Sequence, residues 1–351
     1  MRILHVIAGA GRGGAETFCL DAIEALHEAG VTQHVVCRPH EHFLATLNKC
    51  GISYDVMAFS YRDRLGRGRA LIEKSVTAFG PDLVHAWMGR AASFIPKSLT
   101  MPVLGWFGGY YDLKRYRSCD FYMGVTKDIV RHIIEKTGKP QRAFLVHTLG
   151  TLKSAPPADR AALATPPDAP VVLLLSRMHW KKGVDTLLEA ASRLPGVYFW
   201  LAGDGPELEK YRALSASLGL GDRVRFLGWR TDRAALLGAA DVCVLPSRYE
   251  PFGTVIPEAW SMAVPLVATR ADGARQYVTD GENGLLCAID NPAELAEKIN
   301  LAVNDSAVRD RLKKNGLIAY QENFSKKVVI DSLIGAYSDI KKIGKKTRSA
   351  A

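Results

Sequence analysis

Residues 171–206 read VVLLLSRMHWKKGVDTLLEAASRLPGVYFWLAGDGP and predict a strand, a loop, a helix and a second strand in direct succession. The run VVLLLSR is apolar without alternation, which is typical of a strand covered on both faces. KGVDTLLEAASRLP then places apolar residues at helical spacing, and VYFWLAGDG returns to a strand pattern. A strand, a helix and a strand in this order indicate a parallel sheet.

The same alternation runs through most of the chain. Between its two halves, TLKSAPPADRAALATPPDAP has five prolines and no strand pattern, which is typical of a linker. Further strands are expected at 224–228, 241–247 and 265–270 in the C-terminal half, and at 2–8, 34–38, 81–87, 102–107 and 121–125 in the N-terminal half.

We therefore predict an α/β protein with two Rossmann-like, doubly wound domains. Two such domains place the ends of their strands on either side of a cleft, and ligands bind at those strand ends. The expected divisions are an N-terminal domain at 1–152, a linker at 153–169, a C-terminal domain at 170–325, and a last helix with a basic tail at 326–351.

Composition and length fit a globular protein of this kind. The chain has 351 residues, 48% hydrophobic and 23% charged, and no apolar run approaches the roughly 20 residues of a membrane span. The N-terminal apolar segment is too short for a signal peptide, so we expect a cytoplasmic protein. No C-x-x-C, H-E-x-x-H or D-x-D pattern occurs, so no bound metal is expected.

A net charge of +10 indicates acidic partners. Neither of two basic clusters matches a nucleic-acid-binding signature, so no nucleic acid is expected. Each cluster is either a solvated face or a contact with an anionic membrane surface, which would make the protein peripheral on the inner face of the cell membrane. The clusters are Arg62, Arg64, Arg67 and Arg69 in one, and Lys341, Lys342, Lys345, Lys346 and Arg348 in the other.

Two acids stand eight positions apart in SRYEPFGTVIPEAW, residues 247–260. Prolines and a glycine make one continuous helix improbable, so Glu250 is expected in a loop after a strand and Glu258 in the first turn of a helix that Pro257 opens. Carboxylates accept hydrogen bonds from paired hydroxyls, so one acid could hold a ribose and the other a sugar ring. Alternatively, Glu258 only complements the helix dipole.

Other polar residues are also expected just after strands. Arg177 and Lys182 precede a helix whose dipole does not favour them, so a bound diphosphate would explain them; otherwise they are exposed loop cations. Gly203 in AGDGP and Arg225 in VRFLG are weaker signals, the latter placed at a strand end where backbone groups could meet a nucleobase.

The first glycine loop offers G-x-G-x-x-G spacing at Gly9, Gly11 and Gly14. A dinucleotide site also needs an acid at the end of the second strand, and that position holds Arg38. The loop therefore either meets an oxyanion or a sugar at the helix start, or is only a tight turn.

Six motifs in order, GGAE, SRMHWKKG, AGDGP, FLG, EPFGTVIPEA and DGENGLL, resemble the GT-B glycosyltransferases, specifically family 4, which is retaining and carries an E-x7-E motif. The resemblance covers nearly the whole chain and is strongest from Val171 to Leu286. It implies transfer of a hexose-type sugar from a UDP or GDP sugar to a glycan or glycolipid acceptor, in lipopolysaccharide or cell-surface polysaccharide synthesis. It implies retention of anomeric configuration, no cofactor, no required metal, and a last helix that returns to the first domain.

The resemblance also assigns roles to residues. Arg177, Lys182 and Glu250 would be catalytic, with the two cations on the diphosphate and the acid on the transferred sugar. Glu258 would bind the ribose. The other implied donor-binding residues are Gly13, Gly14, Gly203, Arg225, Phe252, Gly253 and Thr254.

The acceptor side departs from the family. A histidine common after the strand that aligns with PVLGWF is absent, and Phe107-Gly108-Gly109 stands there. His85 either replaces that histidine or is a packed strand residue. HTLGTLKS replaces the usual asparagine-glycine-valine-aspartate segment. We expect acceptor contacts from Tyr110, Tyr111, Asp112 and Lys114.

Two rival functions remain open. A GT-B relative could epimerise or hydrolyse a nucleotide sugar without an acceptor. The second rival is a nucleotide-sugar-binding protein that has lost catalysis. In such a protein we would expect Arg177, Lys182 or Glu250 to be replaced, but all three are present.

Overall fold

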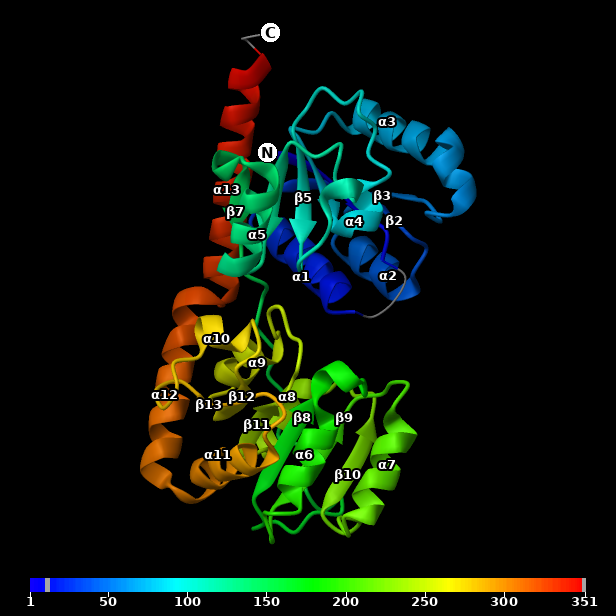
Figure 1. The fold of residues 1–351 in the computed structure, drawn as a ribbon. Coiled ribbons are helices and arrows are strands. Elements are labelled where there is room, and N and C mark those ends of the chain that lie inside the picture. The colour runs from blue at the N-terminus through cyan, green and yellow to red at the C-terminus, as the bar shows by residue number, and fades with distance from the viewer. Residues whose placement is uncertain (10–12, 349–351) are drawn as a thin grey trace. The chain divides into compact units, whose positions relative to one another are not determined.

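The computed structural model describes residues 1–9 and 13–348, with side chains up to Gly344. The chain forms two units, each built on a parallel sheet (Figure 1). Unit 1 comprises Met1–Leu149 and the chain from Lys326 onward, and unit 2 comprises Gly150–Ser325. The predicted α/β architecture with two Rossmann-like sheets is confirmed.

Unit 2 contains a sheet in the order β10-β9-β8-β11-β12-β13. The chain winds outward from β8 to β10 and then returns to place β11 on the other side of β8, so the switch point lies between β8 and β11. The strands are β8 (Val171–Leu175), β9 (Tyr198–Ala202), β10 (Val224–Gly228), β11 (Val242–Leu245), β12 (Leu266–Thr269) and β13 (Leu285–Cys287).

Helices join these strands and supply the core. Leu187 and Leu188 of α6 are buried against β8, whose residues are at most 7% exposed. The helical elements are η4 (Trp180–Lys182), α6 (Val184–Ala191), α7 (Leu208–Ser217), α8 (Arg233–Ala239), α9 (Val255–Ser261), α10 (Ala274–Tyr277), α11 (Pro292–Asn304) and α12 (Ser306–Asn323).

Unit 1 has the sheet order β3-β2-β1-β4-β5-β6-β7, with its switch point between β1 and β4. Its strands are β1 (Arg2–Ile7), β2 (Thr32–Cys37), β3 (Ser53–Val56), β4 (Leu83–Trp87), β5 (Val103–Phe107), β6 (Phe121–Gly124) and β7 (Ala143–Leu145). Its helical elements are α1 (Gly14–Glu28), α2 (Glu41–Lys49), η1 (Asp63–Arg67), α3 (Gly68–Phe79), α4 (Met88–Ala92), η2 (Leu113–Arg115), α5 (Lys127–Thr137), η3 (Pro140–Arg142) and α13 (Lys326–Arg348).

The last helix, α13, packs on unit 1 although it follows unit 2 in the sequence (Figure 1). Lys326 pairs with Glu28, and the Lys341 ammonium lies 2.8 Å from the Asp82 carboxylate. Tyr337 is fully buried. The apolar face of α13 thus completes the core of the first sheet.

The segment 153–169, predicted as a linker between the domains, is attached to unit 2: the Arg160 guanidinium donates to Ala239 O and Asp241, and Thr165 Oγ1 accepts from Trp200 Nε1 at 2.9 Å. One local prediction was wrong. Pro257 does not open α9, which begins two residues earlier, at Val255. A proline is tolerated there because the first four helical N–H groups have no partner within the helix.

Candidate functional site

In unit 2, the loops after β8 and β11 are in backbone contact at the carboxyl edge of the sheet. The N–H groups of Arg248 and Tyr249 donate to Lys181 O at 2.8 and 3.2 Å. Gly183 has a φ of 62°, and a Cβ there would lie 2.0 Å from Pro246 O. Only glycine fits such an approach, so this residue type brings the two loops together.

This contact brings a predicted cation and a predicted acid together. Lys182 Nζ donates to a carboxylate oxygen of Glu250, and the two side chains are 24% and 15% exposed. Gly273 N donates to Glu250 O at 2.7 Å, which fixes the backbone of the acid. The pair sits at the switch point between β8 and β11, where ligands bind in open α/β sheets.

Arg177 lies on the loop after β8 and is exposed. It forms no ion pair with any described residue. On the loop after β8, Glu250 therefore balances the charge of Lys182, while the charge of Arg177 stays available to an anionic ligand. Fixed cations of this kind stabilise negative charge that grows as a bond breaks.

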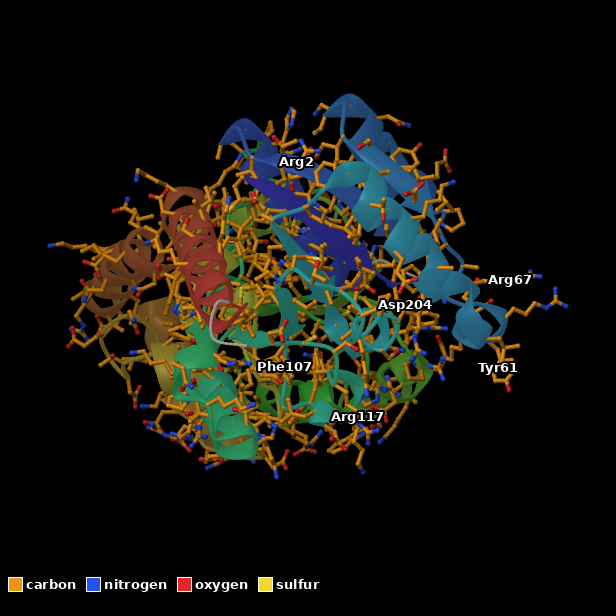
Figure 2. All side chains as sticks on the ribbon, turned by 90° about the horizontal axis from the view of Figure 1, so that it is seen from above. Arg2, Tyr61, Arg67, Phe107, Arg117 and Asp204 are labelled. Atoms are coloured by element: carbon orange, nitrogen blue, oxygen red, sulfur yellow. The ribbon has the colours of Figure 1, made fainter. Side chains whose placement is uncertain are left out.

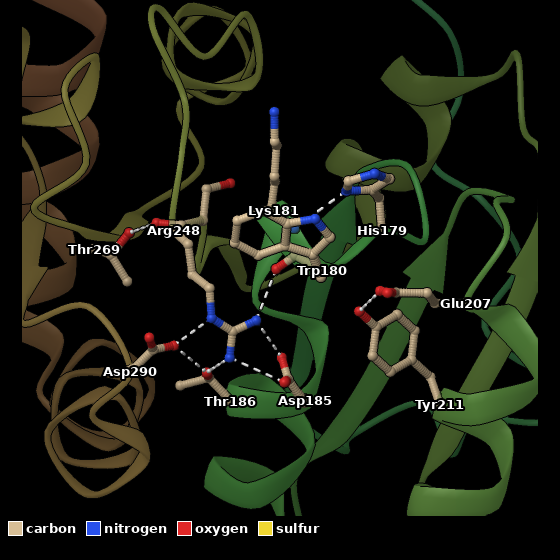
Figure 3. A network of polar contacts seen from close by, with 11 residues as sticks. His179, Trp180, Lys181, Asp185, Thr186, Glu207, Tyr211, Arg248, Thr269 and Asp290 are labelled. Carbon is tan, nitrogen blue, oxygen red and sulfur yellow. Dashed lines mark hydrogen bonds and ion pairs between the residues drawn. The ribbon is translucent and has the colours of Figure 1, made fainter.

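Arg248 holds the two loops in place, a role that the sequence did not reveal. Its guanidinium pairs with Asp185 at 2.9 Å and Asp290 at 2.6 Å, and donates to Trp180 O at 2.7 Å (Figure 3). Hydrogen bonding to Asp185 raises the pKa of Arg248. Partial burial would raise the pKa of Asp185, but the bonds to Arg248 outweigh it and lower that pKa.

Gly203 belongs to a turn that packs directly on the loop after β8. A Cβ on Gly203 would lie 1.8 Å from Ser176 O, and one on Gly205 would lie 2.3 Å from Met178 O. Met178 N donates to Asp204 O at 2.9 Å. The glycines of AGDGP thus set the course of the Arg177 loop.

Phe252 anchors the loop that precedes α9. Its side chain is 5% exposed and its ring lies 5.8 and 5.9 Å from those of Tyr277 and Phe324. Gly253 takes a φ of 84°, and Thr254 is the residue just before α9, without a capping hydrogen bond from its side chain. The Phe252 side chain therefore supports the loop from the core, and the N–H groups of Gly253 and Thr254 are what the loop could offer a ligand.

Glu258 is buried in the first turn of α9, at 4% exposure. One carboxylate oxygen accepts from Arg233 Nη1, from the first residue of α8. Arg233 was missed because its partner is 25 positions away. Its place just after the loop that follows β10, at the same edge of the sheet, is the signal that could have found it.

Arg225 was placed wrongly. It is the second residue of β10, not the end of that strand, so it lies toward the amino edge of the sheet. Its guanidinium donates to Ala164 O at 2.6 Å and Asp222 O at 3.0 Å. These bonds hold the 153–169 segment on unit 2, which is a structural role.

In unit 1, the glycine loop holds a carboxylate. Gly13 caps α1 with an extended φ of −100° and Gly14 is the first helical residue. A Cβ on Gly9 or Gly13 would lie 2.5 Å from a Glu16 carboxylate oxygen, so this acid fills the turn. Its charge disfavours a phosphate at that place and suits a hydroxyl donor; Gly11 lies outside the described residues.

His85 is a core residue of β4 with no exposed surface. Its ring stacks on Trp87 at 4.2 Å between centroids, and its Nδ1 lies 2.7 Å from Tyr337 Oη. Burial, with His5 nearby, holds the pKa of His85 well below its ordinary value. Of the two alternatives that the sequence left open, His85 is therefore the packed strand residue.

The four residues expected to contact the acceptor lie on one exposed segment after β5. Tyr111 is 38% exposed, and Tyr110 packs edge-on against His132 at 5.6 Å between centroids. Asp112 caps η2 through Lys114 N at 2.9 Å, and its carboxylate lies 3.5 Å from Lys114 Nζ. The segment thus presents aromatic and charged groups at the carboxyl edge of the unit 1 sheet.

The described residues hold neither a cluster of metal-ligating side chains nor a helix that could span a membrane. Nowhere in that part of the chain do three or more His, Cys, Asp or Glu side chains lie close enough together to hold a metal ion. No helix in that part of the chain has both the length and the apolar character to cross a bilayer.

Comparison with known proteins agrees with this architecture. The family model described as glycosyl transferases group 1 matches residues 157–319. The chain is 34% identical over 339 residues to the lipopolysaccharide core biosynthesis glycosyltransferase LpsE of Rhizobium meliloti, covering 95% of this chain and 98% of the relative. LpsD of the same organism, which carries the same description, is 32% identical over 342 residues, covering 96% and 98%.

Among solved structures, Anabaena HepE in complex with UDP and glucose superposes with a TM-score of 0.82. It covers 96% of this chain and 99% of its own, at 23% identity, which supports the fold. The family match and the full-length relatives lead to one conclusion: the chain belongs to the group 1 glycosyl transferases and is a GT-B glycosyltransferase.

Proposed function

We propose that the protein transfers a hexose-type sugar from a UDP or GDP sugar, with retention of anomeric configuration, to the growing glycan of a lipopolysaccharide or another cell-surface polysaccharide. The carrying observation is the Lys182–Glu250 pair at the switch point of unit 2, with Arg177 on the same loop as Lys182. The names of the full-length relatives, both lipopolysaccharide core glycosyltransferases, support this acceptor class.

The proposed chemistry needs few groups. The bond from the anomeric carbon to the diphosphate oxygen breaks, the acceptor hydroxyl oxygen bonds to that carbon on the same face, and the leaving phosphate takes the hydroxyl proton. Arg177 and Lys182 stabilise the charge that grows on the diphosphate. Glu250 contacts hydroxyls of the transferred sugar, and Glu258, held by Arg233, accepts from the ribose.

The acceptor would approach the exposed segment that carries Tyr110, Tyr111, Asp112 and Lys114. We also propose that unit 1 contacts an anionic membrane surface near η1, where Tyr61 and Leu65 are 76% and 73% exposed among arginines. Figure 2 shows Tyr61 and Arg67 projecting outward. Exposed apolar side chains next to cations suit the interface of an anionic bilayer.

Lys182→Ala tests the donor assignment. Transfer from UDP and GDP sugars to lipopolysaccharide core acceptors would be followed by release of the nucleotide diphosphate. Loss of a fixed cation at the leaving group should lower kcat by about 100-fold or more. Lys210→Ala, which removes an exposed cation of α7, is the matched control and should keep its rate. Near-normal turnover by Lys182→Ala would sink the diphosphate assignment.

The same assay separates the rival functions. A hydrolase releases free sugar at the same rate without acceptor, an epimerase alters the sugar while it stays on the nucleotide, and a binding protein shows ligand binding without turnover. Because Arg177 and Lys182 supply positive charge, we expect transfer to persist in the presence of a metal chelator.

A further inference from the structure

A hollow of about 560 Å³ lies on the surface of unit 1. A second, of about 260 Å³, shares Arg69, Ser93, Lys114 and Arg115 with it. We call the two together the cationic groove. Its charged lining is Arg64, Arg69, Lys97, Lys114, Arg115 and Arg117, with Glu73 as its one carboxylate among the described residues.

These cations come from three separate segments that the fold brings together. Arg64 and Arg69 lie in η1 and at the start of α3. Lys97 follows α4, and Lys114, Arg115 and Arg117 lie in η2 or just after it. Ser118 Oγ donates to Ile95 O at 2.8 Å, which ties the second and third segments. A Cβ on Gly68 would lie 3.0 Å from Phe94 Cδ1, so the first segment is packed on the second. The groove is thus a product of tertiary structure and not of a single basic run.

Most of these charges have no partner within the described residues. Arg69, Lys97, Arg115 and Arg117 form no ion pair there. Lys114 lies 3.5 Å from Asp112, but the two side chains are 78% and 64% exposed, so the pair is weak. Glu73, the lone acid, already accepts from Ser98 Oγ at 2.6 Å. Among the described residues, the six cations of the groove thus outnumber the two carboxylates near them, Glu73 and Asp112, and the groove carries a net positive charge.

The positive charge of the groove also affects Arg90, a neighbouring side chain. The pKa of Arg90 is lowered, first by burial and then by repulsion from Arg38, Arg64 and Arg115. Like charges held together cost free energy that a bound anion would recover. The planar fork of arginine matches phosphate oxygens in pairs, and four arginines line the groove. Its volume also falls in the range of small-ligand sites, roughly 300–1,000 Å³.

We propose that the cationic groove binds phosphate groups on the acceptor, so that the acceptor is a phosphorylated glycan. The identity of the ligand as acceptor rests on the proposed function, whereas the phosphate site itself does not. The phosphate can be carried by a sugar of the glycan or by a lipid headgroup beside it, and the two sources are separated by the probes below.

The experiment compares the full-length chain with Arg69→Glu/Arg117→Glu. Both side chains are exposed, and neither forms an ion pair with another described residue. Lys49→Glu/Lys139→Glu, with the same change of net charge outside the groove, is the matched control. Glucose 1,6-bisphosphate, titrated calorimetrically, is the soluble probe, and phosphatidylglycerol vesicles, tested by co-sedimentation, are the lipid probe. Lys182→Ala is a second control, because it would weaken bisphosphate binding only if the bisphosphate bound at the donor site.

We expect the groove variant to bind glucose 1,6-bisphosphate at least about tenfold more weakly, which is about 1.4 kcal/mol. The control variant and Lys182→Ala should bind it within about twofold of the unaltered protein. A second outcome would assign the phosphate to a lipid headgroup. In that outcome the groove variant loses vesicle binding, and neither the unaltered protein nor any variant binds the bisphosphate. The proposal is overturned if the groove variant binds both probes like the unaltered protein, or if the unaltered protein binds neither. Because binding is measured without a sugar donor, these outcomes do not depend on whether transfer is found.

Discussion

The ion pair between Arg233 and Glu258 positions an acid that would otherwise be costly to bury. Glu258 is 4% exposed, and an ionised carboxylate is stable in such a place only with a close cation and hydrogen bonds. Arg233 supplies the cation from another helix, α8. The carboxylate is therefore held ready for the ribose hydroxyls that we assign to it.

Arg233→Ala should destabilise the protein by about 1–3 kcal/mol, because the buried carboxylate loses its partner. Arg233→Ala/Glu258→Gln should cost less than the sum of the single changes, since a neutral amide needs no cation. Urea unfolding measures all three. Both single variants should also raise KM for the donor. Additive free energies would contradict a direct partnership between these two residues.

Two buried histidines make stability depend on pH. Burial lowers the pKa of His5 to about 3 and that of His85 well below its ordinary value. Below about pH 6.5 the unfolded chain takes up protons that the folded chain refuses, so the free energy of unfolding falls as the pH falls. The stability contributed by the neutral rings is fully present above pH 6.5.

Between pH 6.5 and pH 5, each of these histidines should remove up to about 1.4 kcal/mol per pH unit. Guanidinium unfolding across this window measures the slope. His5→Gln should reduce it, whatever that variant does to stability at pH 8, while substitution of the exposed His42 should leave it unchanged. A slope unaffected by His5→Gln would mean that the ring takes up its proton in the folded protein as readily as in the unfolded chain, which would contradict the lowered pKa.

At the scale of elements, the loops after β8 and β11 act as one assembly through Gly183. Gly183→Ala places a methyl group against Pro246 O, 2.0 Å away, in addition to the cost of a positive φ. We expect destabilisation of at least about 1 kcal/mol and a larger loss of kcat, because the shift separates Lys182 from Glu250. Gly219→Ala is the control: its φ is 67°, yet a Cβ there meets nothing within 4 Å. Equal effects of the two changes on kcat would contradict the proposed coupling of the loops.

The long elements were predictable because their apolar runs leave little choice of structure. Three short strands, β3, β7 and β13, were missed, since three or four residues carry too little periodicity to distinguish a strand from a loop. The proline-rich segment at 153–169 was taken for a linker because its composition resembles one. Its attachment depends on Arg160 and Arg225, whose partners are carbonyl groups that no sequence pattern reveals.

The candidate site shows the same division. Lys182 and Glu250 were predicted as members of one site, because both follow strands and the resemblance to the family assigns both to the donor. Arg233 and Arg248 were not, because their roles come from ion pairs over 25 and 63 positions. His85 was ambiguous in sequence, and only the burial of β4 shows that its ring is packed.

At the scale of the whole molecule, the chain passes between the two units twice, at Leu149–Gly150 and at Ser325–Lys326. Every residue assigned to the diphosphate, the transferred sugar and the ribose belongs to unit 2, except the two glycines of the first loop. Donor binding should therefore stabilise unit 2 most directly. A ligand at 100 times its Kd that binds only the folded state adds about 2.7 kcal/mol.

Hydrogen exchange with UDP or GDP would show where that stabilisation falls. We expect slower exchange in the connections after β8, β9 and β11, at residues 176–183, 203–207 and 246–254, and a smaller change in the sheet of unit 1. Whichever nucleotide protects these segments at the lower concentration identifies the donor base. Lys182→Ala should weaken the protection, because the diphosphate loses a cation, whereas Lys210→Ala should not. Protection confined to unit 1, with the β8 and β11 loops exchanging as in the free protein, would move the donor site to the other sheet and overturn the assignment of Arg177, Lys182 and Glu250 together.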